Sequence, residues 1–194
     1  MELIIRRTII LAAAIVLLAS SPAVAGDRIH LTFGVTGFYP SDSVLREIYG
    51  DYLTGYQVQA SFRFAGNWSI FAGYRSIRTD GAPLVLGEAF EEPSGRIDLD
   101  LSSWRGGVLY ELALRRWTLS FAVGAGQIVC RESWPEADLS ANKKAIGLIL
   151  SAGADVALFG PLGLFVRLEF GPSERKEDVL LGGFDAVGGL SLRF

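Results

Sequence analysis

Few residues in this sequence have the types and spacing that catalysis or metal binding requires. The chain has one His, His30, and one Cys, Cys130. A lone Cys excludes a disulfide within the chain, and without a CxxC pair or a Cys/His cluster there is no ligand set for zinc. His30 lies at the start of one predicted strand and Cys130 just beyond the end of another, so we expect the imidazole and the thiol to be too far apart to act together. We predict no catalytic residue, no metal site and no cofactor.

Most charged residues fall in two kinds of segment. Glu88, Glu91 and Glu92 cluster in a stretch that we interpret as a solvated loop, with a weak cation site as the alternative, and the charged run at 173–178 has the same loop character. The remaining charges of interest stand singly at alternate positions of otherwise apolar stretches. They are Arg63, Arg75, Arg105, Glu111, Asp155, Arg167, Glu169, Asp185 and Arg193.

The elements that carry these charges are eight stretches with a period of two. In the last stretch, from Phe184 to Phe194, every even position is apolar or Gly, which is typical of a strand with one face in an apolar environment. The predicted strands cover about 28–38, 54–64, 68–78, 97–112, 117–128, 145–158, 162–170 and 184–194. In the fourth, residues 97–101 alternate on the opposite parity, and we expect a bulge near Ser102 and Ser103 to reconcile the two halves.

The strand lengths and connectors indicate a membrane barrel. The strands are near the 9–11 residues that a tilted membrane strand needs. Beyond the N-terminal segment no apolar run reaches 18 residues, which excludes helical spans. Short turns alternate with long segments at about 39–53, 79–96, 129–144 and 171–183, as periplasmic turns alternate with outer loops. We predict an all-β fold, an eight-stranded antiparallel up-and-down transmembrane β-barrel, with periplasmic termini. In the first loop, Ser41 to Gly50 has the spacing of a short amphipathic helix.

The N-terminus has the features of a secretory signal peptide. Arg6 and Arg7 precede an apolar stretch at 8–20, and small residues at 23 and 25 precede Gly26. The apolar core is too short for a membrane anchor, which is the alternative reading. We predict cleavage before Gly26, so that residues 1–25 form the signal and residues 26–194 the barrel domain.

The alternation assigns a face to each side chain. The apolar parity carries aromatic residues beside the short turns, where amphipathic rings favour a membrane interface. This predicted periplasmic girdle comprises Phe64, Trp68, Tyr110 and Trp117. The nine single charges fall on the other parity, inside a barrel only wide enough for side chains to fill. We expect them to form a packed plug of ion pairs, because an unpaired buried charge costs several kcal/mol.

The signal peptide, the strand alternation and the tail at 188–194 resemble the class of small eight-stranded outer-membrane barrels that includes the OmpA membrane domain, OmpX and the opacity proteins. The resemblance implies location in the cell outer membrane, lipid and lipopolysaccharide as neighbours, and reading of Leu190, Leu192 and Phe194 by the barrel assembly machinery. The formal net charge of −3 argues against a nucleic-acid partner. The sequence does not identify an extracellular partner.

Fold class alone does not identify function. We expect a non-enzymatic barrel that serves envelope structure or surface interaction through its four extracellular loops. Two alternatives remain, a lipid A-modifying enzyme and a narrow small-solute channel. The enzyme would need a His near the outer leaflet, whereas His30 is expected at the periplasmic end.

Overall fold

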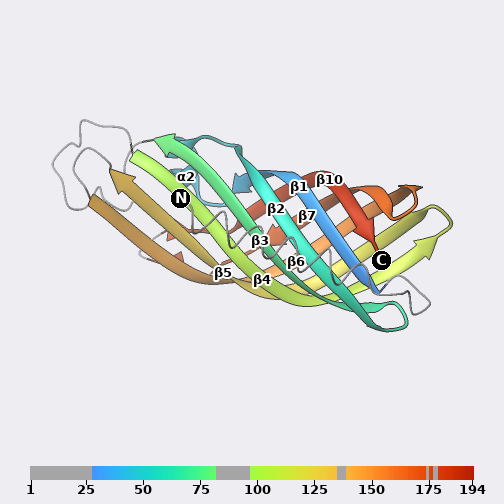
Figure 1. Ribbon diagram of the computed structural model, residues 1–194. Coiled ribbons are helices and arrows are strands. Elements are labelled where there is room, and N and C mark those ends of the chain that lie inside the picture. The colour runs from blue at the N-terminus through green and yellow to red at the C-terminus, as the bar shows by residue number, and fades with distance from the viewer. Residues whose placement is uncertain (1–27, 82–96, 135–138, 174, 177–178) are drawn as a thin grey trace, which may run out of the picture.

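A computed structural model describes residues 28–81, 97–134, 139–173, 175–176 and 179–194. Eight strands form a closed barrel in the order β1-β10-β7-β6-β5-β4-β3-β2, and every neighbouring pair is antiparallel (Figure 1). The barrel strands are β1 (Ile29–Pro40), β2 (Leu53–Ala65), β3 (Trp68–Gly81), β4 (Ile97–Leu114), β5 (Trp117–Trp134), β6 (Leu139–Phe159), β7 (Leu162–Gly171) and β10 (Gly183–Arg193). The predicted fold class is confirmed. The predicted signal peptide and the acidic residues at 88–92 lie outside the described residues.

The barrel closes because its first and last strands pair along their whole length. Their register runs from His30 opposite Arg193 to Pro40 opposite Gly183. The terminal Phe194 joins this ladder through its backbone, accepting hydrogen bonds from Arg28 N and Ile29 N at 2.6 and 2.9 Å. No backbone edge between β1 and β10 is therefore left unpaired, which is the requirement for a sheet that spans lipid.

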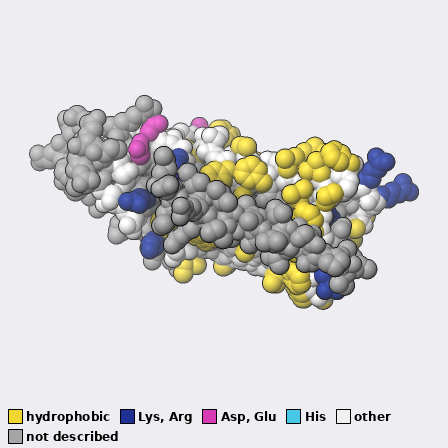
Figure 2. Space-filling model, viewed as in Figure 1, with side chains coloured by type: hydrophobic (Ala, Val, Ile, Leu, Met, Phe, Trp, Pro, Cys, Tyr) yellow, Lys and Arg dark blue, Asp and Glu magenta, His cyan; other side chains and the backbone are white. Residues whose placement is uncertain are grey.

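Side chains alternate between the two faces of the barrel wall as the period of two predicts. On β1, Phe33 and Val35 are 56% and 65% exposed, whereas Gly34 between them and Thr32 and Thr36 on either side are buried. Figure 2 shows the exposed apolar side chains gathered around the body of the barrel, with charged side chains toward its ends. The exposed face of the wall is thus apolar and its inner face polar.

Three two-residue turns join the strands at the periplasmic end. Gly66 and Gly160 supply the left-handed conformation in two of them, with φ of 52° in both. In the third turn Arg115 has a φ of 55°, and this left-handed conformation is unfavourable for a residue with a Cβ atom. The tight turns agree with the predicted short connectors.

The first outer segment contains the predicted helix, α2 (Ser43–Tyr49). Asp42 caps its N-terminus, accepting hydrogen bonds from Val44 N and Leu45 N, and Gly50 ends it at φ 97°. Among the described residues no helix is long and apolar enough to cross a membrane.

The structure of the outer end of the barrel contradicts two predictions, the loop at 129–144 and the bulge near Ser102. Residues 129–144 are not mainly a loop, because β5 and β6 continue their ladder to Trp134 opposite Leu139. The 21 residues of β6 extend about 70 Å along the strand, or about 50 Å along the barrel axis at about 45° tilt, against an apolar band of about 25 Å. In Figure 1, β3 to β6 accordingly run beyond β1, β7 and β10 at the end away from the C-terminus, and β5 and β6 reach farthest. A short hairpin of β8 (Arg175–Lys176) and β9 (Val179–Leu180) lies in the segment predicted as the fourth loop.

The expected bulge near Ser102 is also absent from β4, whose registers with β3 and β5 run without a shift. Leu99 and Leu101 share the inward parity of Ser103 and are buried. In this outer part of β4 the apolar residues point inward and the polar residues outward, so the apparent change of parity is a change of surroundings. The register shifts of the barrel occur instead near its periplasmic end, between Arg63 and Ala65 and between Ala157 and Phe159.

Candidate functional site: the barrel lumen

The nine single charges belong to six strands whose inward positions meet in the lumen. Seven of these residues are more than nine-tenths buried, and Arg63 and Arg193 lie nearer the periplasmic mouth with side chains 32% and 17% exposed. The barrel brings together residues more than 100 positions apart in the sequence, and it sorts them into two groups along its axis.

The lower group surrounds Glu111. Its carboxylate accepts a hydrogen bond from Arg63 Nη2 at 3.1 Å and lies 3.4 Å from His30 Nδ1. On the other side of the imidazole, His30 Nε2 lies 3.5 Å from Asp155. Arg193 Nη2 lies 3.4 Å from Asp155 and 3.9 Å from Glu111. Sequence reasoning expected His30 to be an inward-facing, partly solvated residue at the start of the first strand, and the fold places it there, between two buried carboxylates.

The upper group is built on Glu169 and Asp185. Glu169 forms ion pairs with Arg105 and with Arg167, the latter at 3.5 Å, and accepts a hydrogen bond from Gln57 Nε2 at 3.1 Å. Asp185 pairs with Arg75 and accepts a hydrogen bond from Thr36 Oγ1 at 2.9 Å. These cross-barrel contacts fill the lumen with charge-assisted hydrogen bonds.

Two arginines of the upper group also contact aromatic rings. The Arg75 guanidinium carbon lies 4.4 Å from the centroid of Phe38, and that of Arg167 lies 5.3 Å from the centroid of Phe165. A guanidinium over a ring face gains electrostatic attraction that grows when water is excluded. The rings therefore help to hold these arginines across the barrel.

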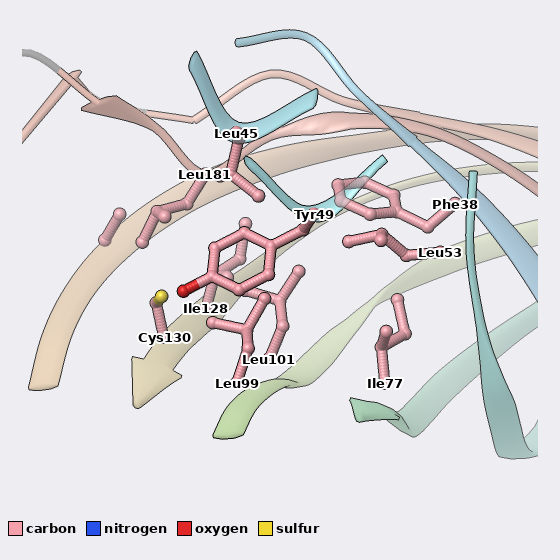
Figure 3. Close-up of a cluster of buried hydrophobic side chains, with 11 residues drawn as sticks. Phe38, Leu45, Tyr49, Leu53, Ile77, Leu99, Leu101, Ile128, Cys130 and Leu181 are labelled. Carbon is pink, nitrogen blue, oxygen red and sulfur yellow. The ribbon is translucent and has the colours of Figure 1, made fainter. Parts of the chain in front are cut away.

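An apolar cluster closes the lumen above the upper group. Leu45 and Tyr49 of α2 point into the barrel (Figure 3), where they belong to one cluster with residues from six strands and with Leu181. The buried members are Phe38, Leu45, Tyr49, Leu53, Ile77, Leu99, Leu101, Ile128, Cys130, Ala145 and Leu181. We call this set the apolar plug. The sequence indicated the helix, and the burial of Leu45 and Tyr49 assigns its inward face to the plug.

Two hydrogen bonds secure the plug to other parts of the fold. Tyr49 Oη donates to the buried Glu132 at 2.7 Å, and burial together with this acceptor raises the pKa of the phenol above its ordinary range. Asp42 Oδ2 accepts from Leu180 N at 3.0 Å and so joins the start of α2 to β9. The first and fourth outer segments are thereby connected across the mouth of the barrel.

The aromatic residues predicted as a periplasmic girdle surround the end with the short turns. Phe64, Trp68 and Trp117 are about half exposed, and Trp68 packs edge-on against Tyr110 with centroids 5.0 Å apart. A second set of rings on the outer half of the wall was missed by sequence reasoning. It comprises Tyr56, Tyr74, Trp104, Phe170 and Phe184, joined by ring contacts within Tyr56–Tyr74–Trp104 and Phe170–Phe184. Their shared parity with the first girdle was the available signal.

The predicted assembly signal lies on the outward face of β10. Leu190, Leu192 and Phe194 are 49%, 36% and 38% exposed. The Phe194 backbone completes the ladder, and its ring is partly exposed on the outward face.

Comparison with known proteins identifies the fold. No family model matches the sequence, and no curated protein does. Among solved structures, Neisserial surface protein A (NspA) superposes with a TM-score of 0.63 at 13% identity, covering 86% of this chain and 97% of that chain. A second structure is Ail, the attachment invasion locus protein of Yersinia pestis, in complex with the heparin analogue sucrose octasulfate. It superposes with a TM-score of 0.53 at 16% identity, covering 87% of this chain and 97% of that chain. This chain has the fold of the small eight-stranded outer-membrane β-barrels.

The exposed apolar wall agrees with that fold. An outer-membrane barrel needs an apolar band flanked by aromatic girdles, with its polar residues turned inward, and the chain has all three features. A soluble protein seldom exposes so continuous an apolar surface. These features locate the barrel in the outer membrane. Within the described residues, no group of three or more His, Cys, Asp and Glu side chains is arranged to hold a metal ion.

Proposed function

We propose that this protein is a non-enzymatic, non-conducting outer-membrane barrel that serves envelope structure or surface interaction through its extracellular end. The observation that carries the proposal is the filled lumen, where two groups of ion pairs and the apolar plug occupy successive levels. A permeating ion would have to break buried pairs at both levels. Each broken pair leaves an uncompensated charge, at a cost of about 3–5 kcal/mol.

Planar-bilayer recording tests the closed lumen directly. The purified barrel should give no steady conductance above the bare bilayer, and so should a control with Val44→Ser, a residue of α2 outside the apolar plug. A variant with Leu45→Ser and Tyr49→Ser should loosen the apolar plug and leave both ion-paired levels closed. It too should therefore give no steady conductance. Steady single-channel steps from the wild-type barrel would favour the alternative small-solute channel and refute the proposal.

The extracellular end supplies the surface for interaction. The strands of its one-sided extension present exposed basic residues on their outer face, among them Arg78, Arg131 and Lys144. Ail was solved with a polyanionic heparin analogue, so sucrose octasulfate is a suitable first probe. Calorimetric titration should give binding that Arg131→Glu with Lys144→Glu weakens at least tenfold, whereas Arg115→Glu at the periplasmic turn leaves it unchanged. Equal binding by all three proteins would exclude this face as the site.

Lipid A modification is the alternative of another class. It would require a nucleophile and a His near the outer leaflet, whereas His30 lies beside Glu111 and Asp155 at the periplasmic end. Mass spectra of lipid A from cells with and without the gene should therefore be identical. A mass difference that depends on the gene would overturn the non-enzymatic assignment.

The remaining parts of the proposal concern biogenesis. We infer that export uses residues 1–25 as a cleaved signal, that lipid and lipopolysaccharide surround the mature barrel, and that the assembly machinery reads its last strand. Mass spectrometry of the protein extracted from outer membranes should find Gly26 as the first residue. An intact N-terminus at Met1 would contradict the proposed cleavage.

A further inference from the structure

The upper group of lumen charges is not electrically balanced. Three arginines, Arg75, Arg105 and Arg167, face two carboxylates, Glu169 and Asp185. Among the described residues, the other side chains hydrogen-bonded to the group are neutral, namely Thr36, Gln57 and Gln59. The nearest further carboxylate is Asp155 of the lower group, which attracts Arg167 from below while it pairs with Arg193. The group therefore carries a net charge of one positive unit among side chains that are at least 94% buried, where an uncompensated ion is costly.

The same arginines retain hydrogen-bond donors without acceptors. Arg105 uses Nη1 for Glu169, while its Nε and Nη2 are buried and have no hydrogen-bond partner. Arg75 uses Nη1 for Asp185, and its Nε is likewise buried and unpartnered. The side chains of Arg105 and Arg75 are only 3% and 4% exposed. A buried donor without an acceptor costs about 1–3 kcal/mol, and more when it is charged.

A cavity lies beside these donors. Its volume is about 30 Å³, and it is lined by both arginines, by Ser103 and by Phe38 and Ile128 of the apolar plug. Glu169 and Asp185 also line it, but each is already engaged by an arginine. A cavity must offer roughly 10–15 Å³ to hold one water molecule. By this measure the cavity holds one small inorganic ion or about two water molecules, and it is far too small for a sugar or a lipid headgroup.

We propose that the cavity binds a single small monovalent anion of the halide class, held by the unpartnered guanidinium nitrogens of Arg105 and Arg75. The bound anion balances the extra positive charge and accepts the orphan hydrogen bonds. It sits directly beneath the apolar plug, because Phe38 and Ile128 belong to both the plug and the cavity wall. Halide occupancy thus stabilises the closed lumen, and this property is independent of the proposed surface role.

Bromide is the probe, because it is a halide with an anomalous X-ray signal. The refolded full barrel is unfolded with urea in detergent micelles, in sodium bromide and in sodium gluconate at equal ionic strength. A ligand that binds only the folded state raises the folding equilibrium constant about tenfold when its concentration is about ten times its Kd. We expect bromide to produce a saturating increase that the bulky gluconate does not, and crystals grown in bromide to show an anomalous peak between Arg75 and Arg105.

Variants separate this site from a general salt effect. Ser103→Asp should place a carboxylate in the cavity and abolish the dependence on bromide, while its matched control Ser102→Asp, on the outward face one residue away, should retain it. Arg105→Met removes the excess charge, leaving two arginines for two carboxylates, and should also abolish the dependence if Ser103→Asp does not fold. Equal stability of the wild type in bromide and gluconate, an unchanged dependence in the folded cavity variants, or no anomalous peak in the cavity would each overturn the proposal.

Discussion

A substitution of Glu169 gives the sharpest test of the ion-paired lumen. Substituting Glu169→Gln keeps the shape of the side chain but removes the charge that serves Arg105 and Arg167. The carboxylate is 3% exposed, so both guanidinium groups would stay buried with less compensation. Breaking a buried pair by removing one partner costs about 3–5 kcal/mol.

A matched exposed pair supplies the comparison. Arg78 and Asp100 form the same kind of contact, at 3.1 Å, on the outer face of β3 and β4, where the two side chains are 79% and 36% exposed. Exposed pairs contribute about 0–1 kcal/mol. Asp100→Asn should therefore cost at most about 1 kcal/mol, although it removes the same charge as Glu169→Gln.

Equilibrium urea unfolding in detergent micelles, followed by Trp fluorescence and by the gel shift between boiled and unboiled samples, measures both variants. Since about 1.4 kcal/mol is tenfold in an equilibrium constant, Glu169→Gln should lower the folding constant by about two to three and a half orders of magnitude. Asp100→Asn should lower it less than about tenfold. Similar losses for the two variants would show that burial does not set the strength of these pairs, and the reasoning about a closed, charge-filled lumen would fail with it.

Three further predictions concern the ends of the barrel. The folded state raises the pKa of Tyr49, so the contribution of this phenol to the free energy of unfolding should be fully present below the ordinary tyrosine pKa of about 10 and should fall as the pH rises above it. Tyr49→Phe should flatten this fall, measured as urea midpoints between pH 8 and 11. The control Tyr52→Phe, at a ring 75% exposed, should leave the fall unchanged. Arg115→Gly should stabilise the barrel by up to about 1 kcal/mol, because Gly adopts the positive φ of this position without strain. Arg116→Gly should give no such gain. Equal changes in the thermal unfolding temperature of the two variants would contradict this reasoning. Phe194→Ala retains the backbone bonds of the last strand, so it should reduce the yield in outer membranes while the free energy of unfolding of the refolded protein, measured in urea, stays within about 1 kcal/mol of the wild type. An unchanged yield would count against recognition of that ring.

The sequence by itself determined the inner and outer faces of the wall. Because strand side chains alternate with a period of exactly two, the outward apolar residues, the inward charges and the periplasmic girdle followed from parity alone. The turns and the cap of α2 were equally local, since they depend on residues such as Gly66 and Asp42 and their immediate neighbours.

Only the tertiary structure decided which inward charges meet and where the membrane wall ends. Arg75 and Asp185 are 110 positions apart, and their contact depends on the stagger and tilt of a closed sheet, which no single strand encodes. For a related reason, the sequence pattern did not reveal that β5 and β6 continue beyond the membrane band. Above the membrane, water replaces lipid outside and α2 fills the inside, so the apolar parity of Leu99 and Leu101 points the opposite way from that of Trp104 below them. Within the membrane band the apolar parity marks the lipid face, but beyond it only the three-dimensional surroundings say which face meets water and which meets the plug.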